Sequence, residues 1–301
     1  MNKRSYRIGF IGAGRAGTAL AMGLAHAGYN VAAVASRTEA PAQALASCIP
    51  GCKATHASEE VLAACDIVFL TMPDDAIASV AASLPWRAGQ AAVHCSGALS
   101  VEALHGAAER GAMTGCFHPL QTFASRQDGE AKLAGSAFAI EGEGWLRAWL
   151  TDAARKLGGF PVYIKAEDKA LYHASAVMAC GYVATLLDAA SGLWEAMGMS
   201  REEGLRALLP LVKGTVATVE ERGPRLGATG PIVRGDAGTV RRHLDALADR
   251  APETLALYHE LGLAMAALAQ RRGSINDTQA EELRGLLESQ ATVHESLAEV
   301  V

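Results

Sequence analysis

The pattern of hydrophobic positions changes its character once along the chain. Up to about residue 165, short apolar runs alternate with stretches in which apolar residues recur at helical spacing. Several runs are unbroken, as is typical of strands buried on both faces of a parallel sheet. The pattern predicts strands at residues 7–11, 31–35, 66–71, 91–95, 113–117, 136–141 and 161–165, and helices between them at 18–27, 41–48, 58–65, 100–109 and 144–157. The fold class expected is α/β, a Rossmann-type doubly wound, mostly parallel sheet.

After residue 166 the strand signal disappears, and the remaining segments have a helical pattern. A long apolar-rich segment runs from Asp168 to Met197, and a helix with a kink at Pro210 follows. Further helices are expected at 239–249 and 252–271 and after a capping box at 278–281. We therefore predict two domains, an α/β domain at 1–165 and an all-helical domain at 166–301.

A glycine motif joins the first strand to the first helix. It contains Gly12, Ala13, Gly14, Arg15, Ala16 and Gly17, in the order strand, G-x-G-x-x-G, helix, strand that a dinucleotide-binding fold requires. Gly14 lets the backbone approach a pyrophosphate, and the helix N-terminus offers N–H groups to it. Arg15 either helps to neutralise phosphate or faces water. The alternative to a dinucleotide site is an ordinary glycine-rich turn.

The end of the second strand indicates which dinucleotide binds. An NAD site usually carries an acidic residue there, which holds the ribose 2′-hydroxyl. Here the chain has Ser36, Arg37 and Thr38, with no acid before Glu39. A guanidinium can bind a 2′-phosphate through two hydrogen bonds, whereas a carboxylate would repel it. The sequence thus favours NADP, unless Arg37 is only a solvated loop residue.

Polar residues follow several of the predicted strands, at the sheet edge where ligands bind in doubly wound folds. Thr71, Met72 and Pro73 are expected to border the cofactor, or else to form a plain turn. Two later clusters suit a small polar substrate or the nicotinamide amide, unless they serve as turns; they contain Ser96 and Gly97, and then His118, Gln121 and Thr122. His94 lies inside a strand and is expected to be structural.

The long helix begins with Lys169, Tyr172 and His173. Lys169 and His173 are four residues apart and share one helix face. Such a face can supply the proton that a carbonyl or imine reduction needs. The alternative is a surface lysine beside a histidine at the edge of the core. In the loop at 223–238, Arg234 is expected to meet an anionic group of the substrate, unless it only pairs with Asp236 acting as a helix N-cap.

Composition excludes several other classes. The 301 residues carry a net charge of −5 without a basic run, so no nucleic-acid partner is expected. Charge or glycine interrupts every apolar stretch before membrane-spanning length, and the basic N-terminal residues run straight into the glycine motif. We expect a cytoplasmic protein that does not interact with membranes. The six cysteines match no zinc pattern, no metal is expected, and all six are interpreted as small buried hydrophobes.

Four strings together resemble a known family. They are His94-Cys-Ser-Gly-Ala98, Phe117-His-Pro-Leu-Gln-Thr-Phe123, Tyr172-His-Ala-Ser-Ala-Val177 and Gly230-Pro-Ile-Val-Arg-Gly-Asp236. The family comprises Rossmann-like NADP-dependent oxidoreductases whose helical C-terminal half is a domain of unknown function. More distantly the chain is similar to pyrroline-5-carboxylate reductase and the β-hydroxyacid dehydrogenases. The resemblance implies a homodimer through the helical domain, and the small and apolar faces at 174–190 and 264–269 favour the same assembly.

One departure from the family pattern concerns the long helix. Cys180-Gly181-Tyr182 stands where the resemblance predicts an asparagine before the tyrosine. If that asparagine binds substrate in relatives, this chain lacks the contact. The function expected is hydride transfer between NADP(H) and a small polar carbonyl or imine substrate, with His173 or Lys169 relaying the proton and Ser96, His118 and Gln121 orienting substrate or the carboxamide. The alternative is a non-catalytic NADP-binding sensor or scaffold.

Overall fold

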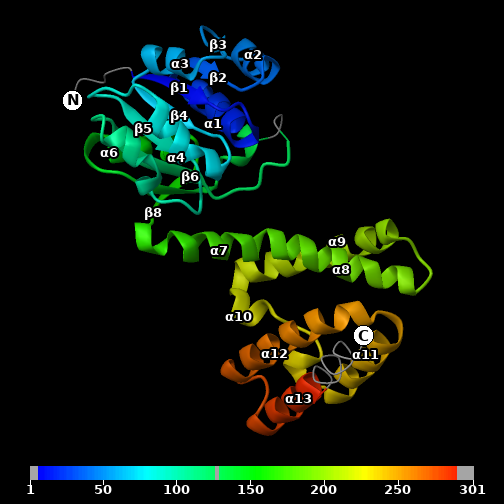
Figure 1. Cartoon of the computed structure of the whole chain (residues 1–301). Coiled ribbons are helices and arrows are strands. Elements are labelled where there is room, and N and C mark those ends of the chain that lie inside the picture. The colour runs from blue at the N-terminus through cyan, green and yellow to red at the C-terminus, as the bar shows by residue number, and fades with distance from the viewer. Residues whose placement is uncertain (1–5, 126–128, 290–301) are drawn as a thin grey trace, which may run out of the picture. The chain divides into compact units, whose positions relative to one another are not determined.

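The computed structural model describes residues 6–125 and 129–289 and divides into two compact units (Figure 1). The sheet unit extends to Cys180, and the helical unit begins at Gly181. The domain boundary predicted from the pattern, at 165/166, follows the last strand. The compact sheet unit continues beyond that point because the next helix, α7 (Lys169–Ala179), inserts the side chain of Lys169 into it with 2% exposure.

An eight-stranded sheet forms the centre of the sheet unit, in the order β3-β2-β1-β4-β5-β6-β7-β8. Strands β1 to β6 pair in parallel, and β7 pairs antiparallel to β6 but parallel to β8. The predicted fold class is confirmed, while the short β3 was missed because three residues give no periodicity. The strands are β1 (Arg7–Ile11), β2 (Asn30–Ala35), β3 (Lys53–Thr55), β4 (Ile67–Leu70), β5 (Ala91–His94), β6 (Met113–Pro119), β7 (Ala137–Glu141) and β8 (Phe160–Tyr163).

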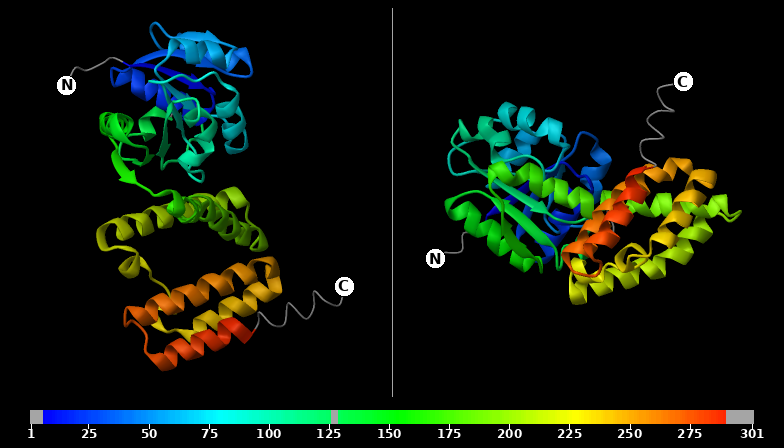
Figure 2. Two further views of the ribbon diagram at one scale, coloured as in Figure 1. Left: turned by 60° about the vertical axis from the view of Figure 1, so that its left-hand side comes forward. Right: turned by 90° about the horizontal axis from the view of Figure 1, so that it is seen from below.

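Helices cover both faces of this sheet (Figures 1 and 2). One face packs against α1 (Arg15–His26), α2 (Glu39–Ser47) and α6 (Gly144–Lys156), and the other against α3 (Ser58–Ala64), α4 (Asp74–Ser83) and α5 (His105–Ala108). On the first face the rings of Phe10 and Phe69 stack at 4.9 Å. All four residues of β4 are buried, as expected for a central parallel strand.

The parallel arrangement brings four segments to one edge of the sheet. The glycine motif follows β1, the Thr71–Pro73 segment follows β4, and the Ser96–Gly97 turn follows β5. His118 lies near the end of β6, which is two residues longer than predicted. These are the carboxyl ends of neighbouring strands, and they define the position of the candidate site.

The helical unit starts with an antiparallel pair, α8 (Gly181–Ala196) and α9 (Arg201–Arg222), which lie side by side in Figures 1 and 2. Gly204 permits their close approach, because a Cβ there would lie 2.6 Å from the ring of Trp194. Ser200 and Glu203 cap α9 reciprocally, as the sequence predicted. Pro210 lies inside α9, where a kink was expected.

The remainder of the helical unit has its own apolar core. It contains α10 (Pro224–Gly227), α11 (Ala237–Arg250), α12 (Leu255–Arg271) and α13 (Asp277–Ser289). The loop at 223–238 is anchored in this core through the buried side chains of Ile232 and Val233. The expected capping box at 278–281 is wrong by two residues, because Asn276 and Gln279 exchange the reciprocal bonds at the start of α13.

Two further expectations require correction. Cys48 and Cys180 are exposed, and only Cys65 and Cys116 are buried, so the cysteines are not uniformly core residues. The helical stretch Ala166–Ala196 is long and apolar enough to cross a membrane by length and composition, with a mean hydropathy of 1.5 over its best window. Gly181 does not shorten this stretch because α8 begins there directly after Cys180.

Asp236 supplies a testable contribution to the stability of α11. Its carboxylate accepts a hydrogen bond from the backbone N–H of Thr239 at 2.9 Å, and hydrogen bonds from the Thr239 side chain and backbone lower its pKa. Asp236→Ala should therefore lower the thermal midpoint at neutral pH. Because the pKa is lower in the folded state, the stabilisation exists above the pKa of the unfolded state and disappears as the pH falls through the folded-state pKa.

The control is Asp245→Ala, an exposed carboxylate in the middle of the same helix. Thermal unfolding followed by circular dichroism should give a larger loss for Asp236→Ala than for the control, and the difference should vanish in acid. Equal midpoints for the two variants at neutral pH would contradict the capping role.

Candidate functional site

The glycine motif forms a tight turn that only glycine can adopt at two of its positions. Gly12 has φ +114°, and a Cβ there would lie 2.8 Å from the backbone of Thr71. A Cβ on Gly17 would lie 2.5 Å from the carbonyl oxygen of Gly12. The Thr71 hydroxyl donates to that same oxygen at 2.7 Å. Thr71 therefore holds the turn in shape from the neighbouring strand.

The space beside Gly14 is open, in contrast to that beside Gly12 and Gly17. A Cβ at Gly14 would meet only the oxygen of Thr71, at 4.0 Å. Helix α1 begins at the next residue, has no side-chain cap, and carries no acid in its first turn. Its first N–H groups can therefore bind an anion in this space, and a dinucleotide pyrophosphate fits the geometry. Arg15 is exposed, and its guanidinium reaches the carbonyl of Ala124 at 3.4 Å.

The segment after β2 suits a ribose that carries a phosphate. Arg37 and Thr38 are exposed and Ser36 is half-buried. Within the described residues Arg37 has no hydrogen bond or ion pair, so the N–H groups of its guanidinium are available to a ligand. The nearest acid, Glu39, is engaged by Gln43 and His56.

The turn after β5 is fixed by a serine whose hydroxyl is fully used. Ser96 Oγ donates to the carboxylate of Asp74 at 2.6 Å and accepts from the N–H groups of Ala98 and Leu99. Ser96 is 5% exposed. Through these hydrogen bonds Ser96 connects the turn after β5 to the start of α4. The hydroxyl proton of Ser96 is donated to Asp74.

Lys169 is buried beneath this turn. Its ammonium lies 3.4 Å from Glu141 Oε1, 3.3 Å from the carbonyl oxygen of Ser96 and 3.1 Å from Cys116 Sγ. Three groups thus surround an ammonium that has three protons. Burial raises the pKa of the Cys116 thiol to about 11, so the thiol stays protonated beside the ammonium. The arrangement ties α7 to β5, β6 and β7.

The same helix presents Tyr172 and His173 on the face next to Lys169. The Tyr172 hydroxyl lies 2.8 Å from His118 Nδ1, and the two rings are perpendicular. A Cβ on Gly97 would lie 2.9 Å from both His118 Nε2 and His173 Cδ2. The glycine after Ser96 therefore lets the turn approach both imidazoles closely.

Burial determines which of these groups carry charge. Burial, with the nearby Lys169 ammonium, lowers the pKa of His118 to about 4, and His173 contributes in the same direction. Burial also raises the pKa of Tyr172 to about 12. At neutral pH His118 is therefore neutral and the Tyr172 hydroxyl keeps its proton.

The structure brings together most of the residues predicted from the sequence. His94 is fully buried with both ring nitrogens bonded to backbone, as expected for a structural residue. The Gln121 amide is engaged by Lys132 and Ser136 within its own loop. Arg234 is exposed in the helical unit, and Asp236 caps α11.

Three residues of the cluster were not predicted as site residues. Tyr172 is three residues after Lys169 and directly before His173. Residues three apart are neighbours on a helix surface, so this spacing could have placed Tyr172 on the same face as Lys169. Cys116 and Glu141 lie in strands that pair with each other, and only the sheet register brings them beneath α7. Within the described part of the chain, no group of three His, Cys, Asp or Glu side chains is placed to hold a metal ion.

The Lys169–Glu141 ion pair gives a test of this arrangement. Lys169→Met removes the ammonium and leaves a buried carboxylate without its cation, which should cost about 3–5 kcal/mol of unfolding free energy. Lys169→Met with Glu141→Gln removes both charges and should recover much of that loss. Denaturant unfolding measures both values. The control, Lys165→Met, removes an exposed ammonium and should cost little; a single Lys169→Met variant as stable as this control would contradict the buried pair.

Comparison with known proteins finds two family models that match successive parts of the chain. A Rossmann-like domain family matches residues 1–119, and the domain of unknown function DUF2520 matches residues 136–265. No curated protein sequence matches the chain significantly.

Solved structures share the architecture. A protein of Bacteroides fragilis described as a candidate NADP oxidoreductase is 27% identical, with a TM-score of 0.73 over 87% of this chain and 98% of that chain. A reductive aminase from Aspergillus terreus, solved with NADPH, is 18% identical, with a TM-score of 0.60 over 96% and 94%. A pyrroline-5-carboxylate reductase from Coxiella burnetii is 17% identical, with a TM-score of 0.58 over 93% and 99%. At such identities the last two establish a common fold. Residues 1–119 thus match a Rossmann-like domain model and residues 136–265 match the model of DUF2520, in agreement with the resemblance that the four motifs predicted.

Proposed function

We propose that this chain is an NADP-dependent oxidoreductase that transfers a hydride between the nicotinamide and a small polar carbonyl or imine substrate. The observation that carries the proposal is that an anion-binding turn and a polar cluster lie at the same edge of the sheet. The glycine turn after β1 offers an anion site at a helix N-terminus, and strands β5 and β6 of the same sheet end at an ordered cluster of His118, Tyr172 and His173. The cofactor supplies the hydride when bound, and the cluster can orient and protonate an acceptor.

The phosphate on the ribose is the basis for choosing NADP. Arg37 projects from the end of β2 with hydroxyl groups on either side, and the one nearby acid is occupied elsewhere. The Bacteroides fragilis neighbour is described as a candidate NADP oxidoreductase, and the Aspergillus terreus reductive aminase was solved with NADPH. Both descriptions agree with the cofactor proposed here.

A non-catalytic NADP sensor is the competing function. A sensor needs the glycine turn and Arg37 but has no use for a tyrosine hydroxyl bonded to a neutral histidine at the sheet edge. The cluster therefore favours an enzyme. Transfer of deuterium from suitably labelled NADPH to a carbonyl or imine product would establish the enzyme, and its absence across a broad panel would favour the sensor.

The cofactor choice is tested by affinity. We expect NADPH to bind at least about tenfold more tightly than NADH, which corresponds to about 1.4 kcal/mol. Arg37→Asp should weaken NADPH binding far more than NADH binding, because only NADPH carries the 2′-phosphate. Titration calorimetry measures both. Arg155→Asp, which changes an exposed arginine on α6, is the matched control and should leave the preference unchanged.

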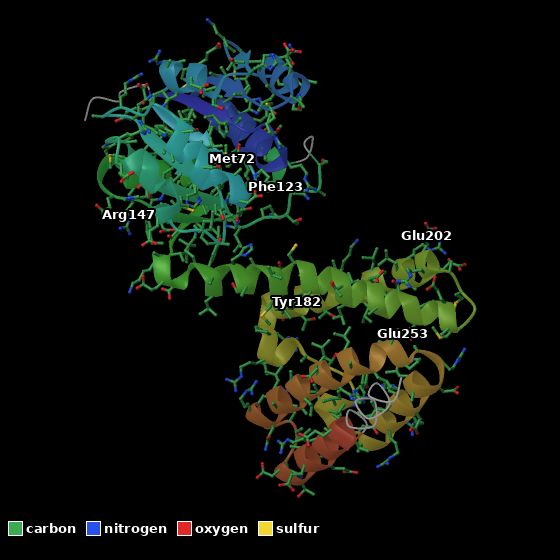
Figure 3. All side chains as sticks on the ribbon, viewed as in Figure 1. Met72, Phe123, Arg147, Tyr182, Glu202 and Glu253 are labelled. Atoms are coloured by element: carbon green, nitrogen blue, oxygen red, sulfur yellow. The ribbon has the colours of Figure 1, made fainter. Side chains whose placement is uncertain are left out.

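We also propose that the chain forms a homodimer through α8 and α9. Each of these helices, although 16 and 22 residues long, buries only one of its residues. Large apolar side chains remain exposed on both: Tyr182 (labelled in Figure 3), Val183, Leu186, Leu205, Leu209, Leu211 and Val216. Exposed apolar side chains in such number on one helix pair favour an interface. Only 6% of the most apolar window in Ala166–Ala196 is buried, which is consistent with a second copy as its cover.

Oligomeric state tests this assembly. Wild-type protein should have a dimer mass in light scattering at micromolar concentration, and Tyr182→Glu with Leu211→Glu should yield a monomer, because two buried carboxylates would oppose the interface. Phe160→Glu changes an equally exposed apolar residue on β8 and serves as control. A monomeric wild-type protein would rule out the dimer.

A further inference from the structure

The cluster at the sheet edge contains many polar protons, and most of them are already committed. The ammonium of Lys169 is 2% exposed and surrounded by three acceptors. The Ser96 proton is donated to Asp74, and the Cys116 thiol is bonded to the carbonyl oxygen of Ser96. The two ring nitrogens of His94 bond to backbone. Each of these four groups is therefore engaged within the protein, Lys169 through two hydrogen bonds and an ion pair.

Tyr172 and His173 remain, and the structure orients only one of them. Both residues are half-buried on the face of α7 that carries Lys169. The Tyr172 oxygen is held at 2.8 Å from His118 Nδ1, whereas the described residues offer His173 no hydrogen-bond partner. A hydroxyl has one proton and two lone pairs. In the tautomer of neutral His118 that carries its proton on Nδ1, the Tyr172 oxygen accepts this hydrogen bond and keeps its own proton for another acceptor; the proposal below assigns that tautomer.

On the basis of the proposed function, we propose that the Tyr172 hydroxyl donates the proton in this reaction, and that its acceptor is the oxygen of a neutral carbonyl group. His118 is a positioning residue that acts through Tyr172. This assigns the role of proton donor to a residue between Lys169 and His173, the two that the sequence suggested, and it narrows the substrate class from carbonyl or imine to aldehyde or ketone.

The proposed step balances as follows. NADPH, when bound, would supply the hydride and be oxidised to NADP⁺ as its C–H bond breaks. The carbonyl carbon would gain that hydrogen with two electrons as the C=O π bond breaks. The Tyr172 O–H bond breaks and its proton forms the new hydroxyl of the alcohol. The phenolate that remains accepts a hydrogen bond from His118 Nδ1–H and regains a proton from water after the product leaves. His118 needs no net charge for this role.

The charges around the cluster favour an acceptor on which negative charge develops. Lys169 lies close enough to lower the pKa of both His94 and His118. Glu141 is paired with that ammonium. The Asp74 carboxylate, which accepts from Ser96, keeps its charge, but it affects the pKa of His94 less than Lys169 does and is not among the groups that shift the pKa of His118. An iminium also gains no proton at nitrogen when hydride adds to its carbon. An oriented phenol is therefore useful for a neutral carbonyl and superfluous for an iminium.

The test compares two probe sets and five variants in the full-length protein. The probes are a panel of aliphatic and aromatic aldehydes and ketones, and a panel of preformed cyclic imines, each assayed by NADPH consumption. We expect turnover with carbonyl probes. Tyr172→Phe, which removes one oxygen, should lower kcat by about 100-fold or more while leaving KM and NADPH affinity unchanged. Tyr163→Phe removes another tyrosine hydroxyl of the sheet unit, one bonded to Thr151, and is the matched control.

Three further variants separate the roles of the histidines. His118→Asn should lower kcat less than Tyr172→Phe, and the double variant should be no slower than Tyr172→Phe alone, because His118 acts only through the phenol. His173→Asn should reduce kcat less than Tyr172→Phe. Full activity of Tyr172→Phe, or a larger loss in His173→Asn, would overturn the assignment while the proposed function stands. Turnover of imines but not carbonyls would overturn the substrate class, and no turnover of either panel would remove the proposed function together with this inference.

Discussion

The buried ion pair of Lys169 and Glu141 is the interaction on which the candidate site depends. The Lys169 side chain is 2% exposed, so its ammonium must be paired and hydrogen-bonded, and its partners come from β6, β7 and the turn after β5. Meeting that requirement fixes the first turn of α7 against the sheet. Because Tyr172 and His173 are three and four residues further along, their positions at the sheet edge follow from the place of Lys169. The ion pair thus positions the chemistry without itself needing to react.

A second constraint acts through small residues. Gly12 and Gly17 are packed so tightly against each other and Thr71 that a methyl group would not fit, whereas Gly14 borders open space. The same principle recurs at Gly97, which lets the β5 turn contact the rings of His118 and His173. Close backbone approach therefore shapes both halves of the site, the part suited to phosphate and the part suited to a small polar acceptor.

The two parts of the helical unit differ in how far their apolar side chains are buried. Its α11–α13 segment buries a core of its own, and the long loop before α11 is anchored there by Ile232 and Val233. Helices α8 and α9, by contrast, leave apolar side chains in solvent. A sheet unit with a complete core and a helix pair with an uncovered face are the features expected if assembly, rather than folding of one chain, completes the structure.

The sequence by itself determined the elements and their class. Unbroken apolar runs predicted seven of the eight strands, and glycine spacing indicated the candidate anion site, because both signals are local. The Ser200–Glu203 capping box at the start of α9 was also predicted from the sequence. The tertiary structure alone decided which polar groups are available. The sequence indicated Ser96 and Lys169 as reactive residues. In the structure Ser96 donates a hydrogen bond to Asp74 and Lys169 forms an ion pair with Glu141, and these partners lie 22 and 28 residues away along the chain. Hydrogen bonds between residues far apart in the chain produce no periodic pattern in the sequence. Tyr172 and His118 are 54 residues apart, so their hydrogen bond follows only from the packing of α7 on the sheet.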